Sequence, residues 1–449
     1  MTTRTRSNGP GPTVLAEPGG GRPFRRSDVV RFMASAEQRQ DPYRMYRRLQ
    51  AHERVHHSVM AVTLVSGYDD VLALLKHPDA SSDETKMDRR FRQGRLGAGR
   101  AVEVPARAAM WAASKRMPGT TVGPFTEMAR RFLLLTDPPD HERLRRLVVR
   151  AFTPRTVDAL VPRIEAIADE LLDGLAPDHG GDLLASYAYR LPVIVICELL
   201  GVPAADHERF AAWVPPLVTG FDAAAALSRG VLRRADEAAL ELDGYLRSLI
   251  EARRADPTDD LISRLVAAAD GDDRLSQDEV VAFVALLLVA GHETTANMIG
   301  NGLVALWSHP EQLARWRDDE AGRVPAVEEL LRFDSTIQMT QRITLAPVSL
   351  PGGTIPAGRL TLLLVAAANR DPERFTDPDR LDLGRDEGPS LSFGFGIHHC
   401  LGASLARAEV AIGLGRLIDR LPGLATEVDA LRWRNNLVFR GLEAFPATW

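Results

Sequence analysis

Cysteine is scarce in this chain of 449 residues, which carries only Cys197 and Cys400. Two thiols exclude a framework of several disulfides, so the sequence favours a reducing, cytoplasmic location. They also exclude a structural zinc module, because such a site needs about four ligands in closely spaced pairs. Cys197 lies inside the apolar segment LPVIVICELLGVP and is interpreted as a core residue. Any special thiol chemistry therefore falls to Cys400.

An excess of positive charge and a long hydrophobic run are also missing. The net charge of −5 argues against nucleic-acid binding. The most apolar run, VVAFVALLLVA, is about half as long as a membrane span, which takes roughly 20 residues. Residues 1–27 are rich in Gly, Pro and Arg and contain no apolar signal-peptide core. We expect no membrane contact, and a flexible tail at 1–27 before one catalytic domain at 28–449.

Apolar residues recur at helical spacing through most of residues 140–340. One segment begins with a capping box, Ser276 and Glu279, and continues for roughly 30 residues without proline. A helix so long and so apolar should cross the centre of a large domain. After residue 342 short strands alternate with Gly/Pro turns, and helix returns only after Cys400. The sequence predicts a mainly α fold with a minor β component, and an irregular surface loop at 83–125.

The segment SFGFGIHHCLGASLARAEV places His398, His399 and Cys400 where a glycine-rich loop enters a helix. A nucleophilic cysteine is one interpretation, although it would need a nearby base. A thiolate ligand to haem iron is another. The free N–H groups of Leu401 and Gly402 at the helix start would favour a thiolate.

The ten residues FGFGIHHCLG resemble the haem-binding loop of the cytochrome P450 family. The match includes each defining position: Phe393, Gly394, Gly396, His398, Cys400, Leu401 and Gly402. The resemblance implies a single large domain with haem b (iron protoporphyrin IX) between the long central helix and the loop and helix around Cys400. It makes Cys400 the iron ligand, gives His398 a haem propionate, and leaves His399 at a variable position. Phe393 would shield the sulfur.

The segment AGHETT interrupts the long apolar helix with polar residues. In the family this segment faces the haem, so the resemblance implies that Gly291 makes room for dioxygen. It also implies that Thr294 and Glu293 route protons to the oxygen during O–O cleavage. His292 occupies a variable position and is expected to point away from the haem.

The segment EELLRF supplies Glu329 and Arg332 at i, i+3 spacing. Such a pair usually lies on a helix surface and contributes little to stability. The resemblance makes it the buried ExxR pair, which braces the haem loop and has a structural role.

The segment TDPPDHERLRRLVVRAF places His141 and Arg145 on one helix face. The resemblance assigns both to the haem propionates, which need cationic or donor partners, and adds Arg342 in TQRITL as a third. Arg146 and Arg150 would then contribute to a basic patch for an acidic electron donor.

The resemblance covers about 40–449 and implies a monomeric monooxygenase, which puts one oxygen atom of O2 into a hydrophobic organic substrate by hydroxylation or epoxidation. Its electrons would come from a ferredoxin-type donor and a ferredoxin reductase. We expect a secondary-metabolite scaffold as substrate, in a pocket formed by segments 83–125, 211–230, 335–339 and 435–441. The pocket residues expected individually are Leu287, Ala290, Ile337, Met339 and Val438.

Two alternatives remain open at this point. The same fold can carry oxidative coupling or peroxide-driven oxidation, but the presence of both Glu293 and Thr294 favours the O2 route. A non-catalytic haem sensor or ligand carrier would use Cys400 and would leave the two relay residues without a purpose.

Overall fold

The computed structural model describes residues 26–58, 62–87, 123–175, 179–221, 229–268 and 275–449. Most of the expected tail at 1–27 and most of the expected loop at 83–125 lie outside these residues. Helix α1 starts at Arg26, two residues before the expected beginning of the domain. Such a difference is within the usual uncertainty of an element boundary.

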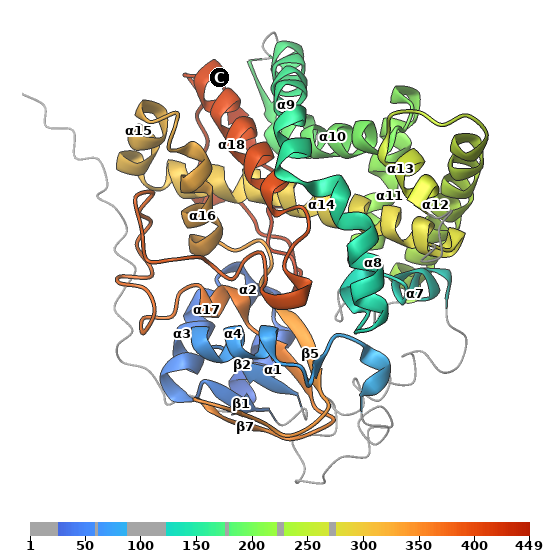
Figure 1. The fold of residues 1–449 in the computed structure, drawn as a ribbon. Coiled ribbons are helices and arrows are strands. Elements are labelled where there is room, and N and C mark those ends of the chain that lie inside the picture. Colours follow the sequence, from blue (N-terminus) through green and yellow to red (C-terminus); the bar gives the residue numbers. More distant parts are fainter. Residues whose placement is uncertain (1–25, 59–61, 88–122, 176–178, 222–228, 269–274) are drawn as a thin grey trace, which may run out of the picture.

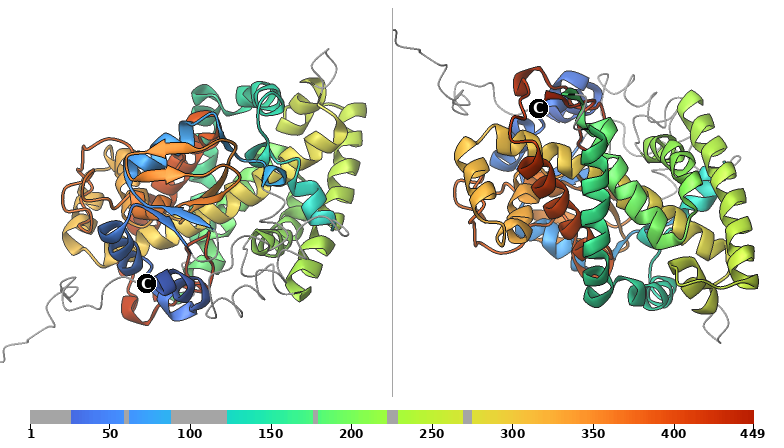
Figure 2. Two further views of the ribbon diagram at one scale, coloured as in Figure 1. Left: turned by 90° about the horizontal axis from the view of Figure 1, so that it is seen from below. Right: turned by 90° about the horizontal axis from the view of Figure 1, so that it is seen from above.

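Helices form most of the molecule and surround one long central helix, α14 (Gln277–Trp307). Figure 1 shows α14 crossing the middle of the helical part, and Figure 2 shows α9 beside α18. The helices near the N-terminus are α1 (Arg26–Ala34), α2 (Ala36–Gln40), α3 (Tyr43–His52) and α4 (Tyr68–Lys76). The middle of the chain contributes α7 (Pro124–Ala129), α8 (Asp140–Val148), α9 (Pro154–Leu175), α10 (Arg190–Leu200), α11 (His207–Gly220), α12 (Arg229–Ala255) and α13 (Leu261–Ala268). The remaining helices are α15 (Pro310–Asp318), α16 (Arg323–Phe333), α17 (Val365–Ala368) and α18 (Ala403–Arg420).

Helix α14 begins as the sequence predicts. The Ser276 hydroxyl accepts the Glu279 N–H at 3.2 Å, and the Glu279 carboxylate accepts the Ser276 N–H at 2.7 Å. Two N–H groups that the helix cannot satisfy internally are thus paired. By length and composition α14 is the one described helix that could cross a membrane, but 67% of its apolar window is buried inside the protein. That burial is the state of a core helix, because α10, α11, α12 and α18 pack around it.

A small sheet lies at one end of the molecule, next to α1–α4 (Figure 1). Its order is β1-β2-β8-β5-β3, and β2 and β8 are parallel with Thr63 opposite Thr361. These strands are β1 (Val55–His57), β2 (Thr63–Val65), β3 (Ala80–Ser81), β5 (Thr340–Thr344) and β8 (Leu360–Leu363). Two short ribbons pair β4 (Gly180–Asp182) with β9 (Pro446–Thr448), and β6 (Val348–Leu350) with β7 (Gly353–Ile355). The mainly α fold with a minor sheet is confirmed.

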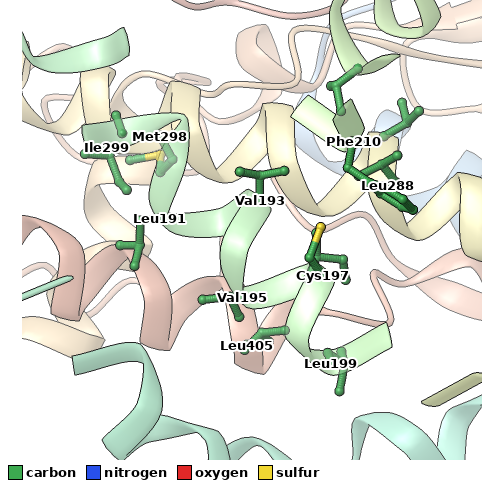
Figure 3. Close-up of a cluster of buried hydrophobic side chains, with 14 of the residues drawn as sticks. Leu191, Val193, Val195, Cys197, Leu199, Phe210, Leu288, Met298, Ile299 and Leu405 are labelled. Atoms are coloured by element: carbon green, nitrogen blue, oxygen red, sulfur yellow. The ribbon is translucent and has the colours of Figure 1, made fainter. Parts of the chain in front are cut away.

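The largest core cluster joins α10, α11, α14 and α18 (Figure 3). Helix α10 comes from the apolar segment around Cys197 and ends at Gly201, whose φ of 76° suits glycine. The Cys197 side chain is fully buried, and this burial raises the pKa of its thiol to about 12. Such a thiol stays protonated at neutral pH, so the structure places Cys197 in the core as predicted.

One part of the predicted order of elements is wrong. Helix returns before Cys400, because Val365–Ala368 directly after β8 forms the short helix α17. All four of its residues are buried, three of them alanines. A run of four apolar residues has no periodicity that separates strand from helix, so packing against α3 and α4 decides its conformation.

Candidate functional site

The loop before α18 is shaped by two glycines in the left-handed region. Gly394 has a φ of 67° and Gly396 a φ of 71°, and a Cβ on Gly396 would lie 2.6 Å from the Leu75 carbonyl oxygen. Only glycine tolerates both the backbone conformation and this close approach. The loop is closed by the Cys400 N–H, which donates to the Phe393 carbonyl at 2.8 Å. The sequence thereby fixes the position of Cys400 three residues before α18 begins.

The Cys400 thiol is accessible, and yet desolvation by the surrounding chain raises its pKa. A group that is both accessible and desolvated lines a space within the protein, where a bound group can reach it. The Gly402 N–H and the positive charges of Arg407 and Arg145 act in the opposite direction and lower that pKa. These are the groups that stabilise a thiolate once a metal ion replaces the proton.

Phe393 is held from the side of α18. The Arg407 guanidinium lies 4.4 Å from the centroid of its ring, a cation–π contact, and Arg407 also pairs with Glu328 on α16. The ring itself packs against the large core cluster. Phe393 is therefore fixed next to the loop that carries Cys400.

Four of the predicted propionate partners gather near the loop from three separate segments. The rings of His141 on α8 and His398 lie 4.3 Å apart between centroids. The Arg145 guanidinium donates to the His399 carbonyl at 2.8 Å, which ties α8 to the loop. Arg342 on β5 is 4% exposed and donates to the neighbouring Gln341 carbonyl at 2.7 Å.

The electrostatics of this cluster call for an anion. Burial, followed by the charges of Arg342 and His141, lowers the pKa of His398 to about 3. Burial lowers the pKa of Arg342 to about 10 and also lowers that of His141. The carboxylate that acts on both Arg342 and His398 is Asp137, which is already paired with Lys86 at 2.6 Å.

Among these residues, His141 gives the strongest indication that the cluster binds a ligand. Its side chain is 1% exposed, and neither ring nitrogen has a hydrogen-bond partner among the described residues. Orphaned buried nitrogens are costly unless a ligand satisfies them. The buried Arg342 and His141, with the half-buried Arg145 and His398, fit the two propionates of a haem, and the accessible Cys400 thiol fits its iron.

The opposite wall is formed by the middle of α14. Ala290 is accessible although Val289, His292 and Glu293 around it are buried. The Thr294 hydroxyl donates to the Ala290 carbonyl at 2.5 Å, so Thr294 lies on the same helix face as Ala290. Both residues therefore border accessible space.

The surroundings of Gly291 leave room beside the helix. A Cβ at this position would have Ile196 on α10 as its nearest neighbour, at 3.9 Å. The side of the helix that Gly291 leaves bare thus faces α10. Ala290 is exposed and Gly291 is half-exposed, and the role expected for Gly291 stays a prediction.

Glu293 and His292 both point away from Thr294. Glu293 is 2% exposed, and its carboxylate accepts from Asn297 at 3.0 Å and from Arg434 at 2.5 Å. The His292 ring donates from Nε2 to the Tyr189 carbonyl at 2.9 Å. Burial lowers the pKa of His292 to about 4, so this ring is neutral at neutral pH. His292 is packed against Tyr189 in the turn before α10, and its expected direction relative to the haem stays a prediction.

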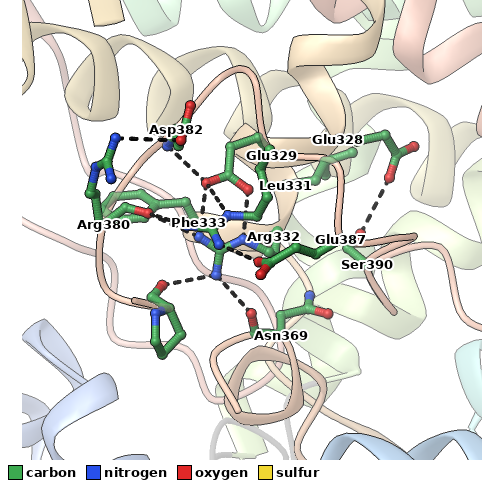
Figure 4. A network of polar contacts seen from close by, with 12 residues as sticks. Glu328, Glu329, Leu331, Arg332, Phe333, Asn369, Arg380, Asp382, Glu387 and Ser390 are labelled. Atoms are coloured by element: carbon green, nitrogen blue, oxygen red, sulfur yellow. Dashed lines mark hydrogen bonds and ion pairs between the residues drawn. The ribbon is translucent and has the colours of Figure 1, made fainter. Parts of the chain in front are cut away.

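The predicted ExxR pair is buried (Figure 4). Arg332 binds Glu329 through two hydrogen bonds, of 2.6 Å and 2.9 Å. It also donates to the carbonyls of Asn369, Pro378 and Arg380. The pair thus ties α16 to the long segment that leads into the Cys400 loop, which is a structural function.

The five individually predicted pocket residues do not share one environment. Leu287, Ile337 and Val438 are half-buried, and the Gln338 N–H donates to the Val438 carbonyl at 2.8 Å, which brings their segments together. Met339 instead belongs to a second core cluster with residues of α1 and α3. It is 6% exposed, and we interpret it as a core residue.

Several residues of the site escaped the sequence analysis. Asn297 lies at i+4 from Glu293, a spacing that could have indicated the contact. Arg434 and Ser82, whose hydroxyl lies 3.0 Å from His398, come from distant segments with no local signal. Of the two arginines proposed for a basic patch, Arg146 is exposed and the side chain of Arg150 lies outside the described residues.

Comparison with known proteins gives the same assignment. The cytochrome P450 family model matches residues 207–320 and 325–424. Vitamin D(3) 25-hydroxylase of Pseudonocardia autotrophica is 49% identical over 320 residues, 70% of this chain and 77% of that protein. Cytochrome P450 monooxygenase PikC of Streptomyces venezuelae is 41% identical over 422 residues, 91% of each chain. The structure of PksS, the P450 of the bacillaene polyketide synthase of Bacillus subtilis 168, has a TM-score of 0.79 at 33% identity, covering 93% of this chain and 98% of that one.

The fold, the Cys400 loop and these similarities define a haem-thiolate class of enzyme. The chain belongs to the cytochrome P450 family and resembles its bacterial members. It is an oxidoreductase, a P450 monooxygenase.

Proposed function

We propose that this enzyme inserts one oxygen atom of O2 into a large hydrophobic secondary metabolite, by hydroxylation or epoxidation. The observation that carries the proposal is the pairing of an accessible, desolvated Cys400 thiol with the orphaned His141 nitrogens. Two relatives support the substrate class through their names, a vitamin D3 hydroxylase and a P450 of a polyketide synthase.

Cys400 would hold the iron of haem b, and His141, Arg145, Arg342 and His398 would hold its propionates. When bound, a thiolate-ligated haem activates dioxygen with two electrons from outside. The protein supplies the cationic cluster that neutralises the propionates and the loop that keeps Cys400 in place. Phe393 and Arg407 would place an apolar ring and a positive charge beside the Cys400 loop.

Proton supply is the task of α14. Thr294 borders the accessible face together with Ala290, and its hydroxyl, which donates to the Ala290 carbonyl, would hold and pass on a proton at this face. Glu293 is one residue away and would carry protons from solvent to Thr294. Two protons are consumed for each O2 when one oxygen atom leaves as water.

The electrons would come from a ferredoxin-type donor and its reductase in the cytoplasm, with this enzyme acting as a monomer. Arg146 is exposed on α8, the helix that Arg145 ties to the Cys400 loop. An exposed cation at this position suits an acidic donor, whose approach would be steered by opposite charge.

The test is turnover with a surrogate ferredoxin and reductase under 18O2, using macrolide and secosteroid substrates that produce a spectral shift on binding. The proposal predicts a product that carries one labelled oxygen atom. A coupled product without the label, or turnover that requires only added peroxide, would contradict it and support oxidative coupling or peroxide chemistry.

A further inference from the structure

The side chain of Asp137, in the turn before α8, holds the segment that follows α4. Its Oδ1 accepts the Ser82 N–H at 2.9 Å, and its Oδ2 accepts from Lys86 Nζ at 2.6 Å and from the Ser81 hydroxyl. Donors from one short segment thus converge on a single carboxylate. This segment is far in sequence from both α8 and the Cys400 loop.

The backbone of the same aspartate fixes the first turn of α8. The Asp137 carbonyl accepts the His141 N–H at 3.0 Å, which places His141 one turn after Asp137. The ring of His141 lies 4.3 Å from that of His398, between centroids. Asp137 therefore acts on His141 through its carbonyl and on the segment of Ser82 through its carboxylate.

Ser82 connects Asp137 to His398. Its hydroxyl lies 3.0 Å from His398 Nε2, and Ser82 is 3% exposed. The preceding residue, Ser81, pairs with Ile343 on β5, so the backbone of this segment is held by the sheet as well as by Asp137. The Ser82 hydroxyl is therefore fixed against the imidazole.

This contact leaves one nitrogen of His398 for a ligand. Within the part of the chain that the structure describes, Nδ1 of His398 has no hydrogen-bond partner. A carboxylate such as a propionate can only accept, so it needs a proton on the nitrogen that faces it. The partner of one ring nitrogen decides whether the other carries the proton. A Ser82 hydroxyl that donates to Nε2 places the proton on Nδ1.

Lys86 offsets the charge of Asp137 beside the cationic cluster. Burial raises the pKa of the Asp137 carboxyl, but hydrogen bonds from Lys86, Ser81 and the Ser82 N–H outweigh it, and the pKa is lowered. Asp137 is therefore a carboxylate at neutral pH. The Lys86 side chain is 38% exposed and that of Asp137 is 14% exposed, so the cation covers the carboxylate from the solvent side. Without Lys86, the negative charge of Asp137 would act unopposed on a propionate in the cluster.

We propose that Asp137 is a positioning residue of the propionate site. Its carboxylate holds Ser82 so that the serine hydroxyl donates to His398 Nε2 and the Nδ1–H of His398 is presented to one propionate. Its carbonyl places His141 beside this ring, so the two histidines act as one pair of donors. This inference rests on the proposed function, because it presupposes that the cluster binds haem.

A matched pair of serine variants separates positioning from a general effect on stability. S82A removes the hydroxyl next to His398 and keeps the backbone bond to Asp137. S81A removes a hydroxyl that binds the same carboxylate, is equally buried and does not contact His398. S82T keeps a hydroxyl and should restore the native behaviour. D137N tests the aspartate itself, with D140N as its control, because the Asp140 side chain is 73% exposed.

The first readout is 15N NMR of the histidine-labelled, reduced, CO-bound holoenzyme, which is diamagnetic. H398Q identifies the signals of His398. In the native enzyme, S81A and S82T, we expect a proton on Nδ1 and the chemical shift of a hydrogen-bond acceptor at Nε2. In S82A and D137N the Nε2 signal should move to that of a nitrogen without a donor. A native His398 whose proton is on Nε2, or an unchanged Nε2 signal in S82A, would overturn the proposal. An unchanged signal in D137N alone would remove Asp137 from it.

The second readout is the rate at which the ferric holoenzyme loses haem to an excess of apomyoglobin. One hydrogen bond lost near the propionate should make S82A release haem about three- to tenfold faster, and D137N about tenfold or more. S81A, S82T and D140N should stay within about twofold of the native enzyme. Equal rates for S81A and S82A would indicate a purely structural role and would overturn the proposal, even if D137N does not fold. A native protein that binds no haem would instead contradict the proposed function itself.

Discussion

The imidazole rings of His141 and His398 lie 4.3 Å apart at an interplanar angle of 58°, and the pKa of each is lowered mainly by burial. Both rings are therefore neutral at neutral pH and can donate one N–H each. With Arg145 and Arg342 beside them they form a compact group of donors that is short of acceptors. This relationship connects α8 and β5 to the Cys400 loop and points to a dianionic ligand.

Removing one cation from this group should weaken haem binding. The change Arg342→Leu leaves a propionate facing an apolar, buried side chain, and we expect haem affinity to fall by about tenfold or more. Haem titration of the haem-free protein measures this directly. The variant Arg359→Leu serves as the control, because Arg359 is a half-buried arginine directly before β8. An equal loss in both variants would contradict the assignment of Arg342.

The ExxR pair should act on stability. Arg332→Lys keeps the charge but loses the bidentate bond to Glu329 and most of the three carbonyl contacts. Breaking a buried pair costs about 3–5 kcal/mol, so we expect a large fall in the unfolding midpoint. Arg380→Lys is the control, because its pair with Asp382 is exposed and should cost less than about 1 kcal/mol. Equal midpoints for the two variants would show that the pair does not brace the loop.

His292 should make stability depend on pH. Its folded pKa of about 4 lies below the value of about 6.5 in an unfolded chain. Between these two pH values the unfolded state binds more protons than the folded state. The contribution of His292 to folding stability is therefore complete above about pH 6.5 and is lost as the pH falls toward 4. The loss is about 2–3 kcal/mol.

The variant His292→Leu should remove this part of the dependence of the unfolding free energy on pH. Unfolding by denaturant at several pH values between 4 and 7 gives the difference in slope between the variant and the native protein. An unchanged slope would mean that His292 is protonated in the folded state, in conflict with its buried Nδ1 and its bond to the Tyr189 carbonyl.

Thr294→Ala should uncouple oxygen consumption from product formation. Without the hydroxyl that borders the accessible face with Ala290, protons reach the oxygen by less selective routes, and product per O2 should fall by about an order of magnitude. Thr295→Ser is the control, since Thr295 is buried on another side of α14. Peroxide release and product are measured together, and full coupling in Thr294→Ala would remove this residue from the relay.

The sequence predicted those parts of the fold whose signals are local. The capping box of Ser276 and Glu279 and the absence of proline defined α14, and Gly201 marked the end of α10. The helix Val365–Ala368 was missed because four apolar residues carry no period. Its conformation depends on packing against segments that a local reading does not contain.

The residues of the site likewise divide into those with a local sequence signal and those that depend on distant segments. Cys400 and the two left-handed glycines of its loop follow from one short motif, and burial of Glu329 with Arg332 follows from the resemblance. Arg434 could not be predicted, because an ion pair between α14 and the C-terminal segment has no sequence spacing. Met339 was predicted as a pocket residue, and only its packing with residues of α1 and α3 shows that it belongs to a core cluster.

The central claim is that Cys400 binds haem iron as a thiolate, and the spectrum of the reduced, CO-bound protein tests it most directly. We predict the strongly red-shifted Soret band of thiolate ligation, with one haem per chain, and its loss in Cys400→Ala but not in Cys197→Ala. A native protein that binds no haem, or a Cys400→Ala variant that keeps the shifted band, would contradict the account.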